Sequence, residues 1–139
     1  MKGIADTGFL VAFANRNDRH HEWAVQVAEC LSEPLLTCEA VLAEACFLLR
    51  RTEGGMEAVM ELLRRGILDL PFLVKAHREP ISWLLRKYSD IPMSLADACL
   101  VRMSEMYSQG PIWTLDGDFR RYRRHGRQMI PVLMPMGIG

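Results

Sequence analysis

Two aspartates follow short apolar segments that have the character of buried strands. Asp6 comes directly after Lys2–Ala5, and Asp116 comes directly after Pro111–Leu115. In open α/β sheets, ligands bind at the edge formed by the carboxyl ends of the strands. Each aspartate alone is also explained as a helix cap, and Asp116-Gly117 is an ordinary turn pair. Together they predict two carboxylates at one edge of a sheet.

Two further acids lie on helical segments among apolar residues. Glu44 precedes Phe47 and Leu48 by three and four residues, and Asp97 precedes Val101 by four. Residues at this spacing share one face of a helix, so both acids are predicted to project among core side chains. A carboxylate in such surroundings requires a cation, a set of hydrogen-bond donors or a proton.

Each of these two acids also has a purely structural explanation. Ser94–Asp97 has the pattern of a capping box, which would place Asp97 on the first turn of a helix for stability alone. Glu44 lies within a helix, and its alternative is a buried salt bridge to an arginine such as Arg50 or Arg102.

The conjunction of the four acids carries more information than any one of them. Four carboxylates a few ångströms apart repel one another and cannot all ionise without a counter-charge. Oxygen-only ligands suit a hard cation, Mg²⁺ or Mn²⁺, better than zinc. Because Mg²⁺ retains several waters and favours phosphate partners, the predicted chemistry is phosphoryl transfer.

The elements that would position these acids follow the pattern of an α/β fold. Short apolar runs alternate with stretches of helical period, which predicts a three-layer α/β/α domain with a central parallel sheet of about five strands. The predicted strands are 2–5, 35–38, 67–71, 111–115 and 130–133. The predicted helices are 7–14, 20–31, 39–51, 56–65, 74–88 and 94–107, with a short one after Asp116. We expect one domain spanning residues 1–139.

The composition is that of an ordinary globular protein. The chain has 139 residues, with 17 basic and 17 acidic side chains and a formal net charge of zero. Its four cysteines, which show no CxxC spacing, are predicted to be small buried hydrophobes of a reduced compartment. With no apolar run long enough to cross a membrane, we expect a soluble, cytoplasmic protein.

Positive charge is concentrated in one segment directly after Asp116. Residues 120–127 contain five arginines and no acid. Arginine binds phosphate with two donors at once, and Tyr122 could stack on a base. The predicted RNA-binding residues are therefore Arg120, Arg121, Tyr122, Arg123, Arg124 and Arg127. The alternative is a solvated helix face, which is the usual fate of a run of charges.

Four short motifs in this order and spacing resemble the PIN-domain family, and within it the VapC-like ribonuclease toxins. The motifs are Ile4-Ala5-Asp6-Thr7, Val41-Leu42-Ala43-Glu44, Pro92-Met93-Ser94-Leu95-Ala96-Asp97-Ala98 and Trp113-Thr114-Leu115-Asp116-Gly117-Asp118-Phe119. The resemblance covers essentially the whole chain. It implies that Asp6, Glu44, Asp97 and Asp116 form the acidic quartet of the family, with Asp118 as an additional acid. It also implies that the first and fourth strands are adjacent. Gly8 departs from the serine that many relatives carry.

The resemblance also implies a function. The expected activity is a Mg²⁺- or Mn²⁺-dependent endoribonuclease, with Asp6, Asp97 and Asp116 holding metal and Glu44 binding a second ion or orienting the attacking water. Thr7 and Thr114 would donate hydrogen bonds to the carboxylates, although strand propensity and capping explain both residues as well. Asp118 would either support the site or form a surface turn.

The expected partners are an RNA substrate, a small antitoxin protein and a second copy of the chain. An apolar surface for the antitoxin could be formed by Phe9, Leu10, Phe13 and Trp23, which are otherwise ordinary core residues. The alternative function is a catalytically inactive PIN-fold module that binds RNA or protein.

Overall fold

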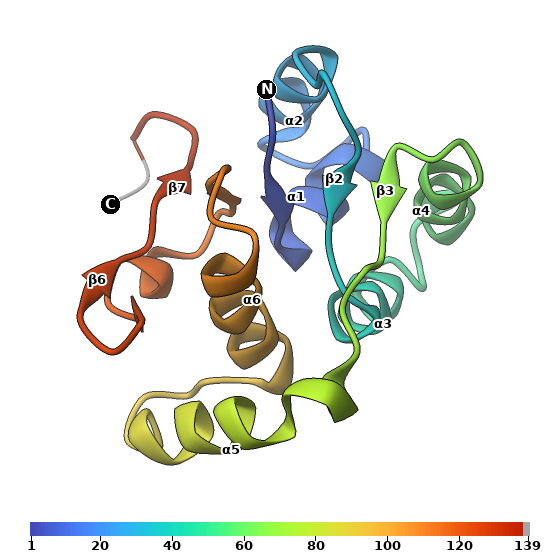
Figure 1. Ribbon diagram of the computed structural model, residues 1–139. Helices are drawn as coiled ribbons and strands as arrows, with labels where there is room; N and C mark the ends of the chain where they lie inside the picture. The colour runs from blue at the N-terminus through green and yellow to red at the C-terminus, as the bar shows by residue number, and fades with distance from the viewer. Residues whose placement is uncertain (138–139) are drawn as a thin grey trace.

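A five-stranded parallel sheet forms the centre of the computed structural model, which describes residues 1–137 (Figure 1). The strand order is β3-β2-β1-β4-β7. The strands are β1 (Ile4–Ala5), β2 (Leu35–Leu36), β3 (Leu68–Asp69), β4 (Ile112–Trp113) and β7 (Val132–Leu133). Ile4 pairs with Leu36 on one side and with Ile112 on the other. The adjacency of β1 and β4 is confirmed, and so is the parallel α/β architecture.

Helices flank the sheet and follow the predicted order. The α-helices are α1 (Thr7–Ala14), α2 (His21–Glu29), α3 (Glu39–Leu48), α4 (Gly55–Arg64), α5 (Arg78–Lys87) and α6 (Leu95–Met106), with short 3₁₀ helices η1 (Val74–His77) and η2 (Gly117–Arg120). Helix α1 contacts α2, α3 and α4, while α6 contacts β1 and α5. None of the helices in residues 1–137 is long and apolar enough to cross a membrane.

The single helix predicted for residues 74–88 is divided into η1 and α5. Pro80 explains the division, because it has no backbone N–H to donate to the carbonyl of Ala76, four residues earlier. The first turn therefore adopts 3₁₀ geometry, and the α-helix begins at Arg78.

The strands at the centre of the sheet are fully buried around Trp113. Its ring packs edge-on against Phe9, with ring centroids 5.2 Å apart. Gly3, just before β1, has no side chain at the point where the backbone passes this ring. A Cβ atom at Gly3 would lie 2.1 Å from Trp113 Nε1. The close approach of these two strands therefore requires glycine.

The basic segment is not a helix face, as one interpretation of the sequence held. Part of it forms an antiparallel hairpin of β5 (Arg123–Arg124) and β6 (Gln128–Met129), which the sequence did not predict. The turn contains His125 and Gly126, with φ of 51° and 81°. Positive φ is common for glycine and tolerated by histidine, which is why this turn forms here.

The cysteines are free thiols with different exposures. Cys38 and Cys99 are buried, Cys46 is half-buried and Cys30 is exposed. The prediction that all four are buried is therefore wrong for Cys30, which directly follows the exposed end of α2.

Candidate acidic active site

Asp6 connects the end of β1 to the start of α1. Its Oδ1 accepts the backbone N–H of Thr7 at 2.7 Å, and its Oδ2 accepts the hydroxyl of Thr114 at 2.6 Å. The residue is only 6% exposed. Burial raises the pKa of Asp6 to about 6 against the lowering effect of these two hydrogen bonds, and the negative charges of Asp97 and Asp116 raise it further. A positive neighbour would therefore stabilise the ionised form of Asp6.

Asp116 lies at the end of β4, the strand next to β1, and is exposed. Its backbone N–H donates to Thr114 Oγ1 at 2.9 Å, the same hydroxyl that donates to Asp6. Its Oδ1 accepts the backbone N–H of Asp118 at 2.9 Å. The two strand-end acids are therefore oriented by one shared threonine hydroxyl.

Glu44 reaches the same region from α3. Thr7 Oγ1 donates to Glu44 Oε2 at 3.0 Å, while the N–H of Thr7 is bound to Asp6. The prediction that Glu44 faces the core was wrong in part, because Phe47 and Leu48 on that face are 61% and 56% exposed. Glu44 itself is half-buried.

An arginine partner for Glu44 is not present in the described part of the chain. Arg50 donates to the carbonyl of Phe47, and Arg102 forms its ion pair with Glu105. Glu44 therefore does not form the salt bridge to Arg50 or Arg102 that the sequence suggested as an alternative.

Asp97 lies on the first turn of α6 and forms the predicted capping box. Its N–H donates to Ser94 Oγ at 3.0 Å, and its Oδ2 accepts the N–H of Ser94 at 3.1 Å. Burial raises the pKa of Asp97, opposed by the Ser94 bonds and reinforced by the charges of Asp116 and Glu44. The capping role is thus real, but it does not remove the repulsion among the acids.

Tyr122 lies in the core and not at the RNA-binding surface that its sequence context suggested. Its side chain is fully buried, with edge-on ring contacts to Tyr88 at 5.0 Å and Phe119 at 5.4 Å. Its hydroxyl donates to Asp97 Oδ2 at 3.4 Å, and burial, followed by the charge of Asp97, raises its pKa. The prediction that Tyr122 stacks on a base is therefore wrong, because the ring has no exposed face. Its contact with Asp97 was missed, since no local signal separates a core tyrosine from an exposed one.

The four acids have the donor chemistry of a site for a hard cation. None of them takes part in the ion pairs formed within residues 1–137. Burial is the main cause of the raised pKa values of Asp6 and Asp97, and the charges of the neighbouring acids add to it. Within the same residues, no three acidic, histidine or cysteine side chains stand close enough to enclose an ion by themselves. The set fits an ion that keeps part of its water, as Mg²⁺ does.

Comparison with known proteins identifies the family to which the chain belongs. A family model for the PIN domain matches residues 4–125. The chain belongs to the PIN-domain family. It is similar to ribonuclease VapC26 of Mycobacterium tuberculosis, with 27% identity over 132 residues that cover 93% of each protein. Its fold is similar to the crystal structure of Mycobacterium tuberculosis VapC20, described as a toxin that cleaves the sarcin–ricin loop. That match has a TM-score of 0.68 and 21% identity, and it covers 85% of this chain and 92% of VapC20.

The arginines of this PIN domain fall into two groups. Arg120, Arg121 and Arg127 are exposed, whereas Arg123 and Arg124 are half-buried. Arg123 donates to the carbonyl of Arg120 at 2.7 Å, and Arg124 donates to the carbonyl of Ser104 at 3.2 Å. The second group therefore holds the segment in place, while Arg121 and Arg127 have exposed side chains at the surface.

Asp118 lies in the turn after β4, where its backbone N–H bonds the proposed site acid Asp116. It is half-buried, and its Oδ1 lies 3.5 Å from Arg121. Its N–H bond to Asp116 fixes the start of η2.

The apolar residues suggested as a partner surface lie mostly inside the PIN domain. Phe9 and Leu10 are buried, so that suggestion is wrong for these two. Phe13 and Trp23 are half-buried and pack against the Phe9 ring at 6.4 and 5.9 Å. Core packing therefore accounts for the side chains of this cluster.

Proposed function

We propose that this PIN-domain protein is a divalent-metal-dependent endoribonuclease and the toxin of a toxin–antitoxin pair. The observation that carries the proposal is the electrostatic state of Asp6 and Asp97. Asp6 is buried and Asp97 is half-buried, the charges of neighbouring acids oppose the ionised form of each, and neither has a cationic partner among the described residues. The similarity to ribonuclease VapC26 supports RNA as the substrate.

In this proposal Asp6, Asp97 and Asp116 hold Mg²⁺ or Mn²⁺, and Glu44 binds a second ion or orients the attacking water. The bound ion would supply the positive charge that offsets the carboxylates and the phosphodiester. Thr7 and Thr114 keep the carboxylate oxygens aimed by their hydrogen bonds. Attack by water needs no 2′-hydroxyl, so the products are a 5′-phosphate and a 3′-hydroxyl.

The exposed arginines supply the contacts to the RNA backbone. Because the net charge of the chain is zero, affinity for RNA depends on this local concentration of charge beside the acids. The proposal also includes an antitoxin protein as partner, a homodimer and a cytoplasmic location, all of which rest on the relationship to VapC proteins.

The test is cleavage of total RNA by the purified protein with added Mg²⁺, with Mn²⁺, and with a chelator. We expect cleavage only with a divalent ion, and loss by orders of magnitude in Asp97→Asn. Glu61→Gln, which changes a half-buried acid on α4, is the matched control and should cut normally. If Asp97→Asn cuts RNA at the parent rate, the role assigned to Asp97 is wrong. RNA binding without cleavage under any ion identifies an inactive binding module instead.

A further inference from the structure

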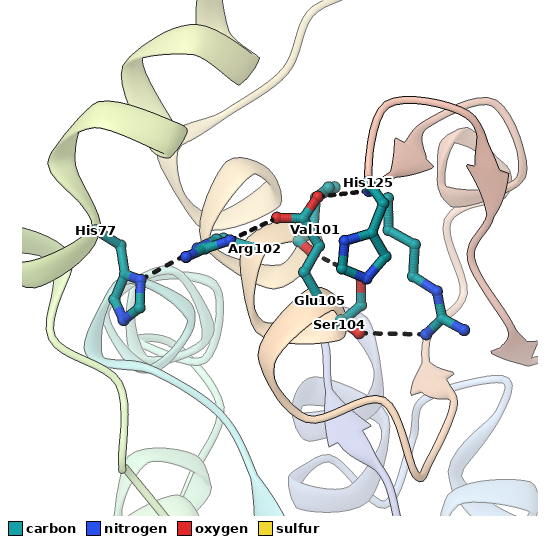
Figure 2. Close-up of polar contacts among 7 residues, drawn as sticks. His77, Val101, Arg102, Ser104, Glu105 and His125 are labelled. Atoms are coloured by element: carbon teal, nitrogen blue, oxygen red, sulfur yellow. Dashed lines mark hydrogen bonds and ion pairs between the residues drawn. The ribbon is translucent and has the colours of Figure 1, made fainter.

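A partly buried ion pair lies on α6, outside the acid site. Arg102 and Glu105 pair at 3.0 Å, and their side chains are only 25% and 10% exposed. Arg102 Nε also donates to Nδ1 of His77 at 3.1 Å, which links α6 to η1 (Figure 2). Figure 2 shows Arg102 between His77 and Glu105, so the guanidinium is held from both sides. Glu105 is therefore oriented by an arginine that is itself fixed.

The second oxygen of Glu105 reaches the basic hairpin. Glu105 Oε2 accepts the backbone N–H of His125 at 2.6 Å, and Oε1 accepts Arg102 (Figure 2). His125 has a left-handed backbone, with φ of 51°. A turn in this conformation needs its polar groups satisfied, and the carboxylate of Glu105 provides the acceptor.

Helices α5 and α6 hold the hairpin at three further points. Lys87 donates to the carbonyl of Gly126 at 3.0 Å, and the N–H of Arg123 donates to the Tyr88 hydroxyl at 2.9 Å. The carbonyl of Ser104 accepts Arg124, as described above. The hairpin is thus fixed to this part of the fold through β5 and its turn.

Helix α6 therefore carries the candidate acid Asp97 near its start and the hairpin contact Glu105 two turns later. Tyr122, which donates to Asp97, directly precedes β5. One rigid helix of 12 residues sets the position of the basic hairpin relative to the acids.

We propose that Glu105 is a positioning residue for RNA. Glu105 fixes the turn at His125. The exposed side chains of Arg121 and Arg127, on either side of this turn, are thereby positioned to contact RNA phosphates. The RNA strand that they contact is the one that is cut at the acids. This inference rests on the ribonuclease function proposed above. Glu105 touches neither the acids nor the substrate, and it acts through the hairpin.

A simple helix-stabilising pair would look different. Glu61 on α4 pairs with Arg64 three residues away and Arg65 four residues away. Both arginines are well exposed, and these pairs join residues of one segment only. Glu105 instead bonds a residue 20 positions along the chain. Glu61→Ala is therefore the matched control for Glu105→Ala.

Steady-state cleavage of a labelled RNA tests the proposal. We expect Glu105→Ala to raise KM about tenfold, the scale of one hydrogen bond to a charged group, while kcat stays within about twofold. Glu105→Gln retains an acceptor for His125 but loses the charge that pairs with Arg102, so KM should rise about threefold. Glu61→Ala should match the parent. An unchanged KM in both Glu105 variants, or a fall in kcat alone, overturns the proposal.

Hydrogen exchange of the His125 amide is a second measurement that needs no RNA. Exchange should be faster in Glu105→Ala, less so in Glu105→Gln, and unchanged in Glu61→Ala. If exchange changes while KM does not, the positioning role is wrong. If the parent protein does not cut RNA at all, the proposed function fails, and the exchange result then reports on the hairpin contact alone. If Glu105→Ala is too unstable to purify, KM and hydrogen exchange are both measured on Glu105→Gln.

Discussion

Thr114 and Asp6 are 108 positions apart in the chain, and their side chains are joined by a buried hydrogen bond of 2.6 Å. The same threonine hydroxyl accepts the N–H of Asp116. The bond exists because β1 and β4 are neighbouring parallel strands that end at the same edge. A single hydroxyl thereby sets the orientation of two of the four acids.

The first prediction concerns this hydroxyl. Thr114→Val keeps the shape of the side chain but leaves Asp6 Oδ2 and the Asp116 N–H without their partner, and it should cost about 1–3 kcal/mol of unfolding free energy. Because the Thr114 bond lowers the pKa of Asp6, that pKa should rise in Thr114→Val.

Cleavage of RNA by Thr114→Val should be slower than by the parent and should require more Mg²⁺. Thr114→Ser, which keeps the hydroxyl, should retain most activity. Chemical denaturation and Mg²⁺ titration measure both effects, and a Val variant equal to the parent in both would contradict this role.

The second prediction concerns stability and pH in the metal-free protein. The pKa of Asp6 is about 6 in the fold, against a reference value of 3.8. A raised pKa means that the fold prefers the protonated form, so the stabilisation is complete below about pH 4 and is lost as the pH rises through about 6. The parent should lose about 3 kcal/mol over this interval, at 1.36 kcal/mol for each unit of pKa.

In Asp6→Asn the free energy of unfolding should decrease much less over this pH interval, because the amide cannot ionise. Urea unfolding in chelator between about pH 4 and pH 7 measures it. Asp90→Asn, which removes an exposed aspartate after α5, is the control. A second arm adds Mg²⁺ at pH 7, which should raise the midpoint of the parent more than that of Asp6→Asn. Parallel pH profiles for parent and Asp6→Asn would show that this carboxyl is not the source of the loss.

The third prediction concerns the glycine beside the central strands. Gly3→Ala places a Cβ 2.1 Å from Trp113 Nε1, and that ring cannot move because it is buried against Phe9. We expect a loss of about 1–3 kcal/mol or more. Gly8→Ala is the matched control, since its Cβ would lie 3.3 Å from Leu115 Cβ and alanine favours the helix α1 by up to about 1 kcal/mol. Thermal unfolding should therefore separate the two variants clearly, and equal midpoints would refute the steric explanation.

The fourth prediction concerns RNA binding by the exposed arginines. Arg127→Ala should weaken binding to RNA of any sequence and reduce the slope of log K against log salt by about 1. Arg64→Ala, which removes an equally exposed arginine from α4, should leave the slope unchanged. Binding is best measured by fluorescence anisotropy in the Asp97→Asn background, where the RNA stays intact. The same slope in Arg127→Ala and the parent would place the RNA elsewhere.

The sequence alone was sufficient to predict the parallel α/β fold, and it supplied the four acids of the proposed site. Apolar runs that end in an acid, such as Ile4–Asp6, and helices with regular apolar spacing are local patterns, so the information lies within a few neighbouring residues. The capping box at Ser94 was also readable, because a cap depends on residues three apart. Local signals of this kind single out Asp6, Glu44, Asp97 and Asp116 in the sequence.

Only the tertiary structure decided what those residues touch and which side chains are exposed. Tyr122 is buried against Tyr88, and its hydroxyl meets Asp97, although its neighbours in sequence are all arginines. Likewise, the apolar face of α3 beyond Glu44 is open to solvent. The physical reason is the same in each case. Burial and hydrogen-bond partners depend on segments far away in the chain that pack against a residue, and no local pattern encodes which segment that will be.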